Sequence, residues 1–166
     1  MVNKEKKPKK VGRPKTILNL DELEKLCRLN CTMPEIASYF NVDVVPLRLV
    51  DSRFYHIDTC FCPLEGGFVM YHPPAFDFDS RIAIESRIPP HKRIIVDTED
   101  AGNFACNAVN IDNKIIVNSA SSHLKKNLSE CGFEVTEVDL SEFLKAGGSA
   151  KCLTLKLVDG VFEIME

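Results

Sequence analysis

Near the N-terminus, apolar residues recur among polar ones at the spacing of two short helices. Residues 19–41 contain both, and in the first the apolar positions share one helical face, while Asn19 or Asp21 can cap the helix. These apolar positions are Leu20, Leu23, Leu26 and Cys27. Asn30 and Cys31 break the pattern, so we expect the first helix to end there and a second helix to follow.

The second helix is predicted from a capping box. Thr32 and Glu35 have the spacing at which each can bind the other's backbone N–H, and Pro34 fits the first helical turn. The predicted buried stripe consists of Ile36, Ala37, Tyr39 and Phe40.

Residues 31–42, CTMPEIASYFNV, resemble the first two helices of helix-turn-helix proteins. In that family a third helix follows and enters the major groove of DNA. Here residues 44–49 are β-branched and interrupted by Pro46, which favours a strand, with a short helix capped by Asp43 as the alternative. A DNA-binding element and a helix pair without that role both remain open.

From Val44 onward the pattern predicts alternating strands and helices, and therefore an α/β fold. Predicted strands are residues 44–49, 68–71, 93–96, 105–111, 114–118, 133–138 and 152–157. Predicted helices are residues 77–87, a segment from Ser119 or Ser121 to Gly132, and residues 141–145. Asp112 and Asn113 indicate a hairpin turn. The order corresponds to about two β-β-α-β modules and one further strand.

Charge divides the chain into three parts. The net charge is only -3, yet seven of the 21 basic residues lie in the first fifteen positions. We therefore predict a disordered basic arm in residues 1–15, a two-helix segment in 16–43 and an α/β domain in 44–166. The arm, from Lys4 to Lys15, could contact nucleic acid, and its KKVGRPK run resembles an AT-hook core with Val11 in place of Arg. A solvated tail is the alternative.

Cysteine usage and hydropathy predict a cytoplasmic protein without a membrane segment. No apolar run approaches the roughly 20 residues needed to cross a bilayer. The seven cysteines show no disulfide framework and no export signal precedes them, so we expect reduced thiols. Cys60 and Cys62, near His56, are spaced too closely for the usual zinc sites, and we expect no metal.

Two segments carry residue types suited to nucleophilic chemistry. Cys152 follows a glycine-rich loop, GGSAK, in which Lys151 would favour the thiolate. A small buried cysteine is the alternative. If residues 54–61 are extended, the side chains of His56 and Asp58 point to the same side of the strand. That side could face a cleft, or it could face solvent.

Three segments together resemble the amidinotransferase superfamily: FYHIDTCFCPL at 54–64, FACNAVN at 104–110 and GGSAKCLT at 147–154. That superfamily includes arginine deiminase, dimethylarginine dimethylaminohydrolase, arginine dihydrolase and glycine amidinotransferase. The resemblance runs from about Val44 to Val158.

The resemblance implies a pentein fold, five β-β-α-β modules around a central active site, of which this chain would hold about two. It implies that Cys152 attacks a guanidinium carbon and that His56 acts as acid and base. Asp58 would hold a guanidinium nitrogen of an arginine-like substrate. No metal or organic cofactor is implied.

Relatives in this superfamily also grip their substrate with acidic residues from earlier modules, which have no counterpart in this sequence. Three cases follow: the chain is active alone, it is active with a complementing chain or as a homo-oligomer, or it is inactive. The alternative is a phage-like DNA-binding or packaging accessory protein that carries a vestigial enzyme domain.

Overall fold

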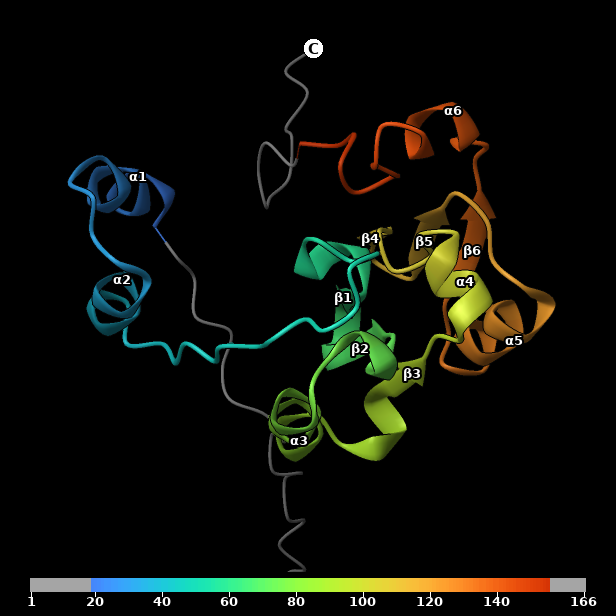
Figure 1. Cartoon of the computed structure of the whole chain (residues 1–166), viewed down its shortest axis with the longest axis horizontal. Coiled ribbons are helices and arrows are strands. Elements are labelled where there is room, and N and C mark those ends of the chain that lie inside the picture. Colours follow the sequence, from blue (N-terminus) through green and yellow to red (C-terminus); the bar gives the residue numbers. More distant parts are fainter. Residues whose placement is uncertain (1–18, 156–166) are drawn as a thin grey trace, which may run out of the picture. The chain divides into compact units, whose positions relative to one another are not determined.

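The chain divides into two units between Pro46 and Leu47 in the computed structural model, which describes residues 19–155 (Figure 1). The predicted basic arm, Lys4 to Lys15, lies outside the described residues. No helix within residues 19–155 is both long enough and apolar enough to cross a membrane.

The first unit contains the two predicted helices, α1 (Leu20–Arg28) and α2 (Met33–Tyr39). The Asn19 side chain caps α1 by accepting a hydrogen bond from Glu22 N at 3.3 Å. At the start of α2, the Glu35 carboxylate accepts a hydrogen bond from Thr32 N at 2.7 Å. Both helix starts therefore use residues that the sequence indicates.

Burial in α2 only partly follows the predicted stripe. Ile36 and Ala37 are buried, whereas Tyr39 is 56% exposed. Residues 40–48 form neither a strand nor a third helix. The strand predicted for residues 44–49 is therefore wrong, and only Leu49 makes an isolated bridge, to Phe76.

The second unit consists of two modules with the same β-β-α-β order (Figure 1). The first contains β1 (Phe61–Leu64), β2 (Phe68–Tyr71), α3 (Phe78–Arg87) and β3 (Arg93–Ile95). The second contains β4 (Val109–Ile111), β5 (Lys114–Val117), α5 (Ser122–Glu130) and β6 (Glu134–Glu137). In each, the first two strands are antiparallel and the last two are parallel. The prediction of an α/β fold with two such modules is confirmed.

The first strand of the first module is not the predicted one. β1 pairs with β2 from Phe61 opposite Tyr71 to Leu64 opposite Phe68, and β3 lies on the other edge of β2. Both edges of β2 are therefore occupied, so residues 44–49 cannot pair with it. Pro63 is tolerated because β1 lies at the edge of its sheet.

Short helices connect these elements. Four are 3-10 turns: η1 (Ile57–Thr59), η2 (Glu65–Gly67), η3 (Pro73–Ala75) and η4 (Pro90–Lys92). Two are α-helical: α4 (Thr98–Gly102) between the modules and α6 (Ser141–Leu144) after them. The pattern does not predict α4, which is capped by the Asp97 side chain accepting from Asp100 N at 2.8 Å.

Predicted helix signals in the second unit match the structure. Asp77 caps α3 by accepting from Ser80 N at 2.8 Å, and Ser121 caps α5 by accepting from Leu124 N at 3.1 Å. Gly132 has a φ of 89° just after α5, and Asp112 has a φ of 51° in the hairpin between β4 and β5.

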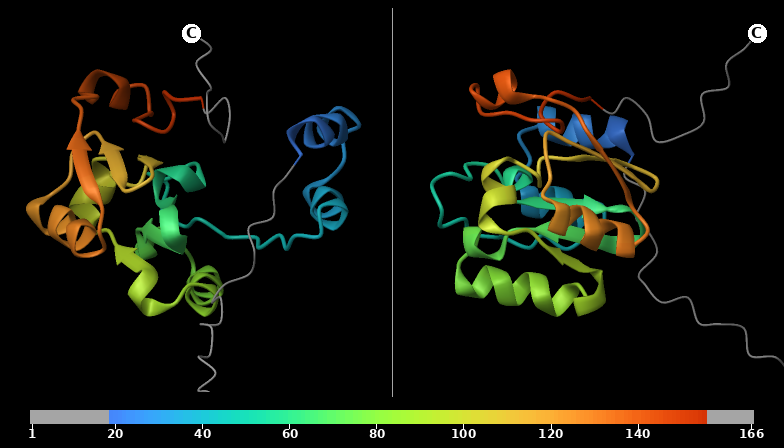
Figure 2. Two further views of the ribbon diagram at one scale, coloured as in Figure 1. Left: turned by 180° about the vertical axis from the view of Figure 1, so that it is seen from behind. Right: turned by 90° about the vertical axis from the view of Figure 1, so that its right-hand side faces the viewer.

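One hydrophobic core extends through both modules, which lie side by side (Figure 2). Phe68 of the first module contacts Phe133 of the second with ring centroids 5.5 Å apart. The buried Asp100 carboxylate adds a polar link, since it accepts hydrogen bonds from Ser121 N and Ser121 Oγ, each at 2.7 Å. These contacts fix the two modules against each other.

Candidate active site

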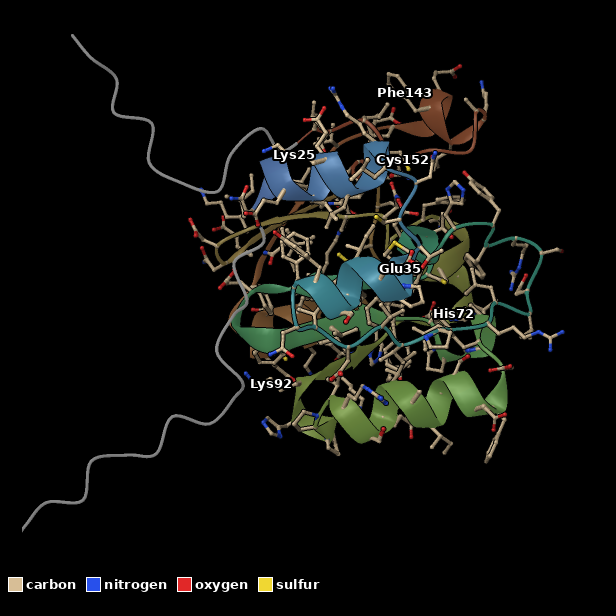
Figure 3. The ribbon with its side chains drawn as sticks, turned by 90° about the vertical axis from the view of Figure 1, so that its left-hand side faces the viewer. Lys25, Glu35, His72, Lys92, Phe143 and Cys152 are labelled. Carbon is tan, nitrogen blue, oxygen red and sulfur yellow. The ribbon has the colours of Figure 1, made fainter. Side chains whose placement is uncertain are left out.

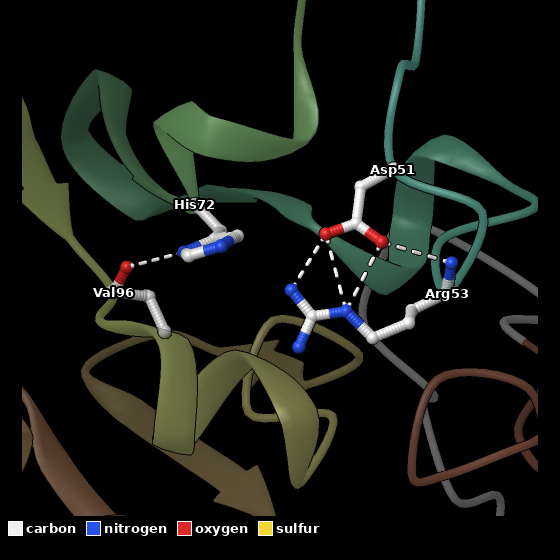
Figure 4. Close-up of polar contacts among 4 residues, drawn as sticks. All are labelled: Asp51, Arg53, His72 and Val96. Carbon is white, nitrogen blue, oxygen red and sulfur yellow. Dashed lines mark hydrogen bonds and ion pairs between the residues drawn. The ribbon is translucent and has the colours of Figure 1, made fainter.

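The segment that leads to His56 is fixed by a local ion pair and a buried ring. Arg53 donates from its backbone N and its Nε to Asp51 Oδ1, each at 3.0 Å, and from Nη2 to Oδ2 at 2.6 Å (Figure 4). These bonds lower the pKa of Asp51 to about 2. Phe54, next in the chain, is buried. The exposed residues Tyr55 and His56 therefore follow an anchored position.

His56 and Asp58 do not lie on an extended strand. Residues Ile57–Thr59 form the 3-10 turn η1, with His56 as its N-cap residue. The buried Thr59 stabilises the turn by donating from Oγ1 to His56 O at 2.6 Å. The expectation that residues 54–61 are extended is thus wrong, because local hydrogen bonds at Thr59 favour a turn.

The Cys152 loop follows α6, and Cys152 is an exposed residue on it (Figure 3). Gly147 has a φ of 81°, which favours glycine, and the Tyr55 hydroxyl lies against it. Leu153 N donates to Ser149 O at 3.2 Å and Thr154 N to Lys151 O at 3.3 Å. Residues 150–153 therefore form a turn, and the prediction that a strand begins at Cys152 is wrong, while residues 156 and 157 of that predicted strand lie outside the described residues.

Asn107 connects the two segments through both ends of its amide. Its Oδ1 accepts hydrogen bonds from Ser149 N and Cys152 N, each at 3.2 Å. Its Nδ2 donates to Cys152 Sγ at 3.2 Å and to Asp58 Oδ2 at 3.1 Å. Asn107 itself is fully buried. Its backbone O also accepts from Lys151 N at 3.1 Å.

Asp58 and Cys152 come together although they lie far apart in the sequence. Cys152 Sγ is 3.7 Å from Asp58 Oδ2 and can donate its proton to that carboxylate. His56 instead contacts its own segment, with its ring centroid 5.0 Å from that of Tyr55. Within the described residues, no hydrogen bond joins His56 to Cys152. The structure therefore brings together two of the three predicted site residues directly.

A cavity of about 280 Å³ opens beside Asp58. Its lining is mixed, with charged, amide, thiol and apolar groups: Asp58, Phe61, Cys62, Pro63, Leu64, Glu65, Cys106, Ala108, Asn110 and Lys151. A space of this size, with charges of both signs at its wall, can accept part of a small polar molecule.

The other cysteines of this unit differ from Cys152 in burial. Cys60, Cys62 and Cys106 are buried. Burial raises the pKa of the Cys60 thiol to about 12 and that of Cys62 to about 11, and it raises the pKa of Cys106 as well. These thiols are thus protonated and poorly reactive near neutral pH. Among residues 19–155, no group of three potential ligands could hold a metal ion.

Sequence reasoning assigned no role to Asn107 or Tyr55. Asn107 lies in the FACNAVN segment, and its presence in one of three matching segments was the only available signal. Its contacts depend on how residues more than 40 positions apart meet, which no local pattern can express.

The chain is similar in sequence to known enzymes, although no family model matches it. It is 59% identical over 128 residues to the bifunctional arginine dihydrolase/ornithine cyclodeaminase ArgZ of Synechocystis, an alignment that covers 77% of this chain. It is 40% identical over 123 residues to N(G),N(G)-dimethylarginine dimethylaminohydrolase of Mycobacterium tuberculosis, covering 74% of this chain. The chain carries part of an amidinotransferase-superfamily domain.

Solved structures agree with this assignment. The N-terminal domain of ArgZ, covalently bound to a reaction intermediate, superposes with a TM-score of 0.73 at 60% identity, covering 76% of this chain. A saxitoxin-pathway amidinotransferase from Microseira wollei, at 18% identity and a TM-score of 0.57, shares the fold. The two β-β-α-β modules are thus modules of the pentein fold, as the resemblance implied.

The chain spans only part of each relative. The alignments cover 18% of ArgZ and 40% of the mycobacterial enzyme, and 47% of the solved ArgZ domain. The names of these relatives refer to guanidino-modifying enzymes. They give no support to the alternative of a DNA-binding accessory protein, or to a nucleic-acid partner.

Proposed function

We propose that this chain carries the nucleophile-bearing part of a hydrolase that acts on the guanidino group of arginine or an arginine derivative. The observation that carries the proposal is the 3.7 Å separation of Cys152 Sγ and Asp58 Oδ2. A sulfur nucleophile beside a carboxylate suits a planar cation, because the carboxylate can bind a guanidinium N–H while the sulfur faces the central carbon.

In the proposed reaction, the Cys152 thiolate forms a C–S bond to the guanidinium carbon. The C–N bond to the leaving amine then breaks as His56 supplies a proton, which leaves a thiouronium-type intermediate on the sulfur. Water, losing a proton to His56, next adds to the same carbon and the C–S bond breaks. Asp58 holds a guanidinium nitrogen throughout. The step requires no metal or organic cofactor.

Hydrolysis is favoured over amidino transfer by the identity of the relatives. The proteins that match at 59% and 40% identity are named a dihydrolase and a dimethylaminohydrolase. The named amidinotransferase matches at 18% identity, which supports the fold alone. Arginine is the preferred substrate class because the more similar relative is an arginine dihydrolase.

The test is to incubate the full chain with arginine, and separately with dimethylarginine, and to quench in acid. Released ammonia or dimethylamine is measured together with citrulline and ornithine, and mass spectrometry of the Cys152 peptide detects the trapped adduct. We expect both product and adduct, and we expect Cys152→Ala to abolish both.

Cys27→Ala is the matched control, since Cys27 is an exposed thiol of the other unit and should not affect either readout. Turnover that survives in Cys152→Ala would contradict the assigned nucleophile. The absence of product and adduct from the wild-type chain would contradict the proposed function of the chain.

A further inference from the structure

The Asn107 amide contacts every part of the candidate site that the structure brings together. One atom, Oδ1, accepts from two N–H groups of the nucleophile loop, at Ser149 and Cys152. The other, Nδ2, points to the Cys152 sulfur and the Asp58 carboxylate. The Asn107 side chain is fully buried, and its partners Asp58 and Cys152 lie at the surface above it.

We propose that Asn107 is a positioning residue that sets both the location and the charge state of the Cys152 sulfur. Through Oδ1 it fixes the backbone of the loop, and through Nδ2 it places an N–H donor on the sulfur. The inference rests on the proposed role of Cys152 as the nucleophile, but its test does not require turnover.

The Nδ2 donor has a specific consequence for the sulfur. A hydrogen bond from an N–H group favours the anionic form of its acceptor, whereas the neighbouring Asp58 carboxylate disfavours a second negative charge. The charged groups beside Cys152 are Asp58 at 3.7 Å and Lys151 next to it in the chain. Because Nδ2 binds both the sulfur and Asp58 Oδ2, it lies where it can reduce the repulsion between them.

A purely structural role would predict a different result. If Asn107 only anchored the loop, removing its donor while keeping its acceptor would leave the sulfur unchanged. Asn107→Asp makes this separation, because an aspartate oxygen can still accept from Ser149 N and Cys152 N but cannot donate to the sulfur. Asn107→Ala removes the donor without adding a charge, and it removes the Oδ1 acceptor as well.

The experiment measures the rate at which iodoacetamide alkylates Cys152 in the full chain from pH 5 to pH 10, with each cysteine peptide followed by mass spectrometry. In both variants, we expect the rate at pH 7 to fall by at least about fivefold, and the pH of half-maximal rate to rise. We expect the larger shift in Asn107→Asp, since its carboxylate also repels the thiolate.

The other cysteines supply internal controls. Exposed Cys27 should react equally in all forms, and buried Cys60 and Cys106 should stay protected, which shows that the fold is intact. Asn118→Asp is the matched control, because it adds the same charge in the same unit and removes an Nδ2 donor, here to Ser119 Oγ at 3.5 Å, while Oδ1 can still accept from Leu140 N at 2.8 Å. It should leave the Cys152 profile unchanged.

Two outcomes would overturn the proposal. A wild-type pH profile for Cys152 in Asn107→Asp would show that the Nδ2 donor has no effect on the sulfur. A shift in Asn107→Asp that is absent from Asn107→Ala would assign the effect to the added charge. Either result leaves the proposed guanidino chemistry untouched, so failure of this inference can be distinguished from failure of the proposed function.

Discussion

Asp58 Oδ2 lies 3.7 Å from Cys152 Sγ, although 94 positions separate the two residues in the sequence. The pair combines a cation-binding group with a nucleophile, so the site should discriminate between electrophiles by charge. Two reagents with the same leaving group and different charge can measure this property directly.

We expect 2-chloroacetamidine, which is cationic, to label Cys152 faster than neutral 2-chloroacetamide by at least about tenfold, after each rate is divided by that of exposed Cys27. Asp58→Asn should reduce this preference, because the amide no longer attracts the cation. Mass spectrometry of the cysteine peptides gives both rates. Equal preference in wild type and Asp58→Asn would show that Asp58 does not hold the cation.

Gly148 should control the position of Cys152 with little effect on the rest of the fold. A Cβ at Gly148 would lie 3.2 Å from Cys152 Cβ, closer than most such contacts, so Gly148→Ala should displace the nucleophile. We expect slower alkylation of Cys152 and a melting temperature close to that of wild type. Gly102→Ala, where an added Cβ meets nothing within 4 Å, is the control and should change neither quantity appreciably.

Asp100 should contribute strongly to stability, because it is 3% exposed and accepts two 2.7 Å bonds from Ser121 at the start of α5. Asp100→Ala leaves those donors without their partner, and we expect it to lower the free energy of unfolding by about 2 to 3 kcal/mol. Asp79→Ala, at an exposed position in α3, should cost less than about 0.5 kcal/mol. Urea unfolding of both variants tests this, and equal costs would contradict it.

The buried thiols should make the second unit sensitive to alkaline pH. The pKa of Cys60 is raised to about 12 and that of Cys62 to about 11, from an ordinary value of 9.0. Groups whose pKa is raised by folding stabilise the fold fully below the unfolded pKa, and lose this contribution as the pH rises through the folded one. The free energy of unfolding should therefore fall between about pH 9 and pH 12.

The measurement compares urea unfolding at pH 8 and pH 10.5. Wild type should lose stability between the two, and the double variant Cys60→Ala, Cys62→Ala should lose less, even if it is less stable at pH 8. An identical decrease in both proteins would assign the alkaline sensitivity to other groups.

Local signals in the sequence determined much of the fold. Asp77, Ser121 and Gly132 mark helix ends, and the structure uses them as caps. Hydrophobic spacing alone did not place the first strand, since residues 44–49 are as apolar as residues 61–64. The choice of the segment that pairs with β2 depends on how the preceding chain is arranged in space. It is therefore a tertiary property, which local spacing does not contain.

The candidate site was only partly accessible from sequence. Cys152, His56 and Asp58 could be named because their segments resemble a known superfamily, and their roles remain proposals. The relative positions of their side chains could not be predicted, because the turn at Ile57–Thr59 depends on a hydrogen bond of the Thr59 hydroxyl. The contacts of Asn107 depend on the docking of one module against another.

The hydrogen bonds of Asn107 join residues 42 to 49 positions apart, so they cannot form until large chain loops have closed. Contacts of this kind are expected to appear late during folding, after the local hairpins and helices. A rate of Cys152 alkylation above that of the unfolded chain's thiols should then appear only in the last stage of refolding. If alkylating reagent is added in pulses at different times of refolding, the rate at which Cys152 is labelled reports when the tertiary structure is complete.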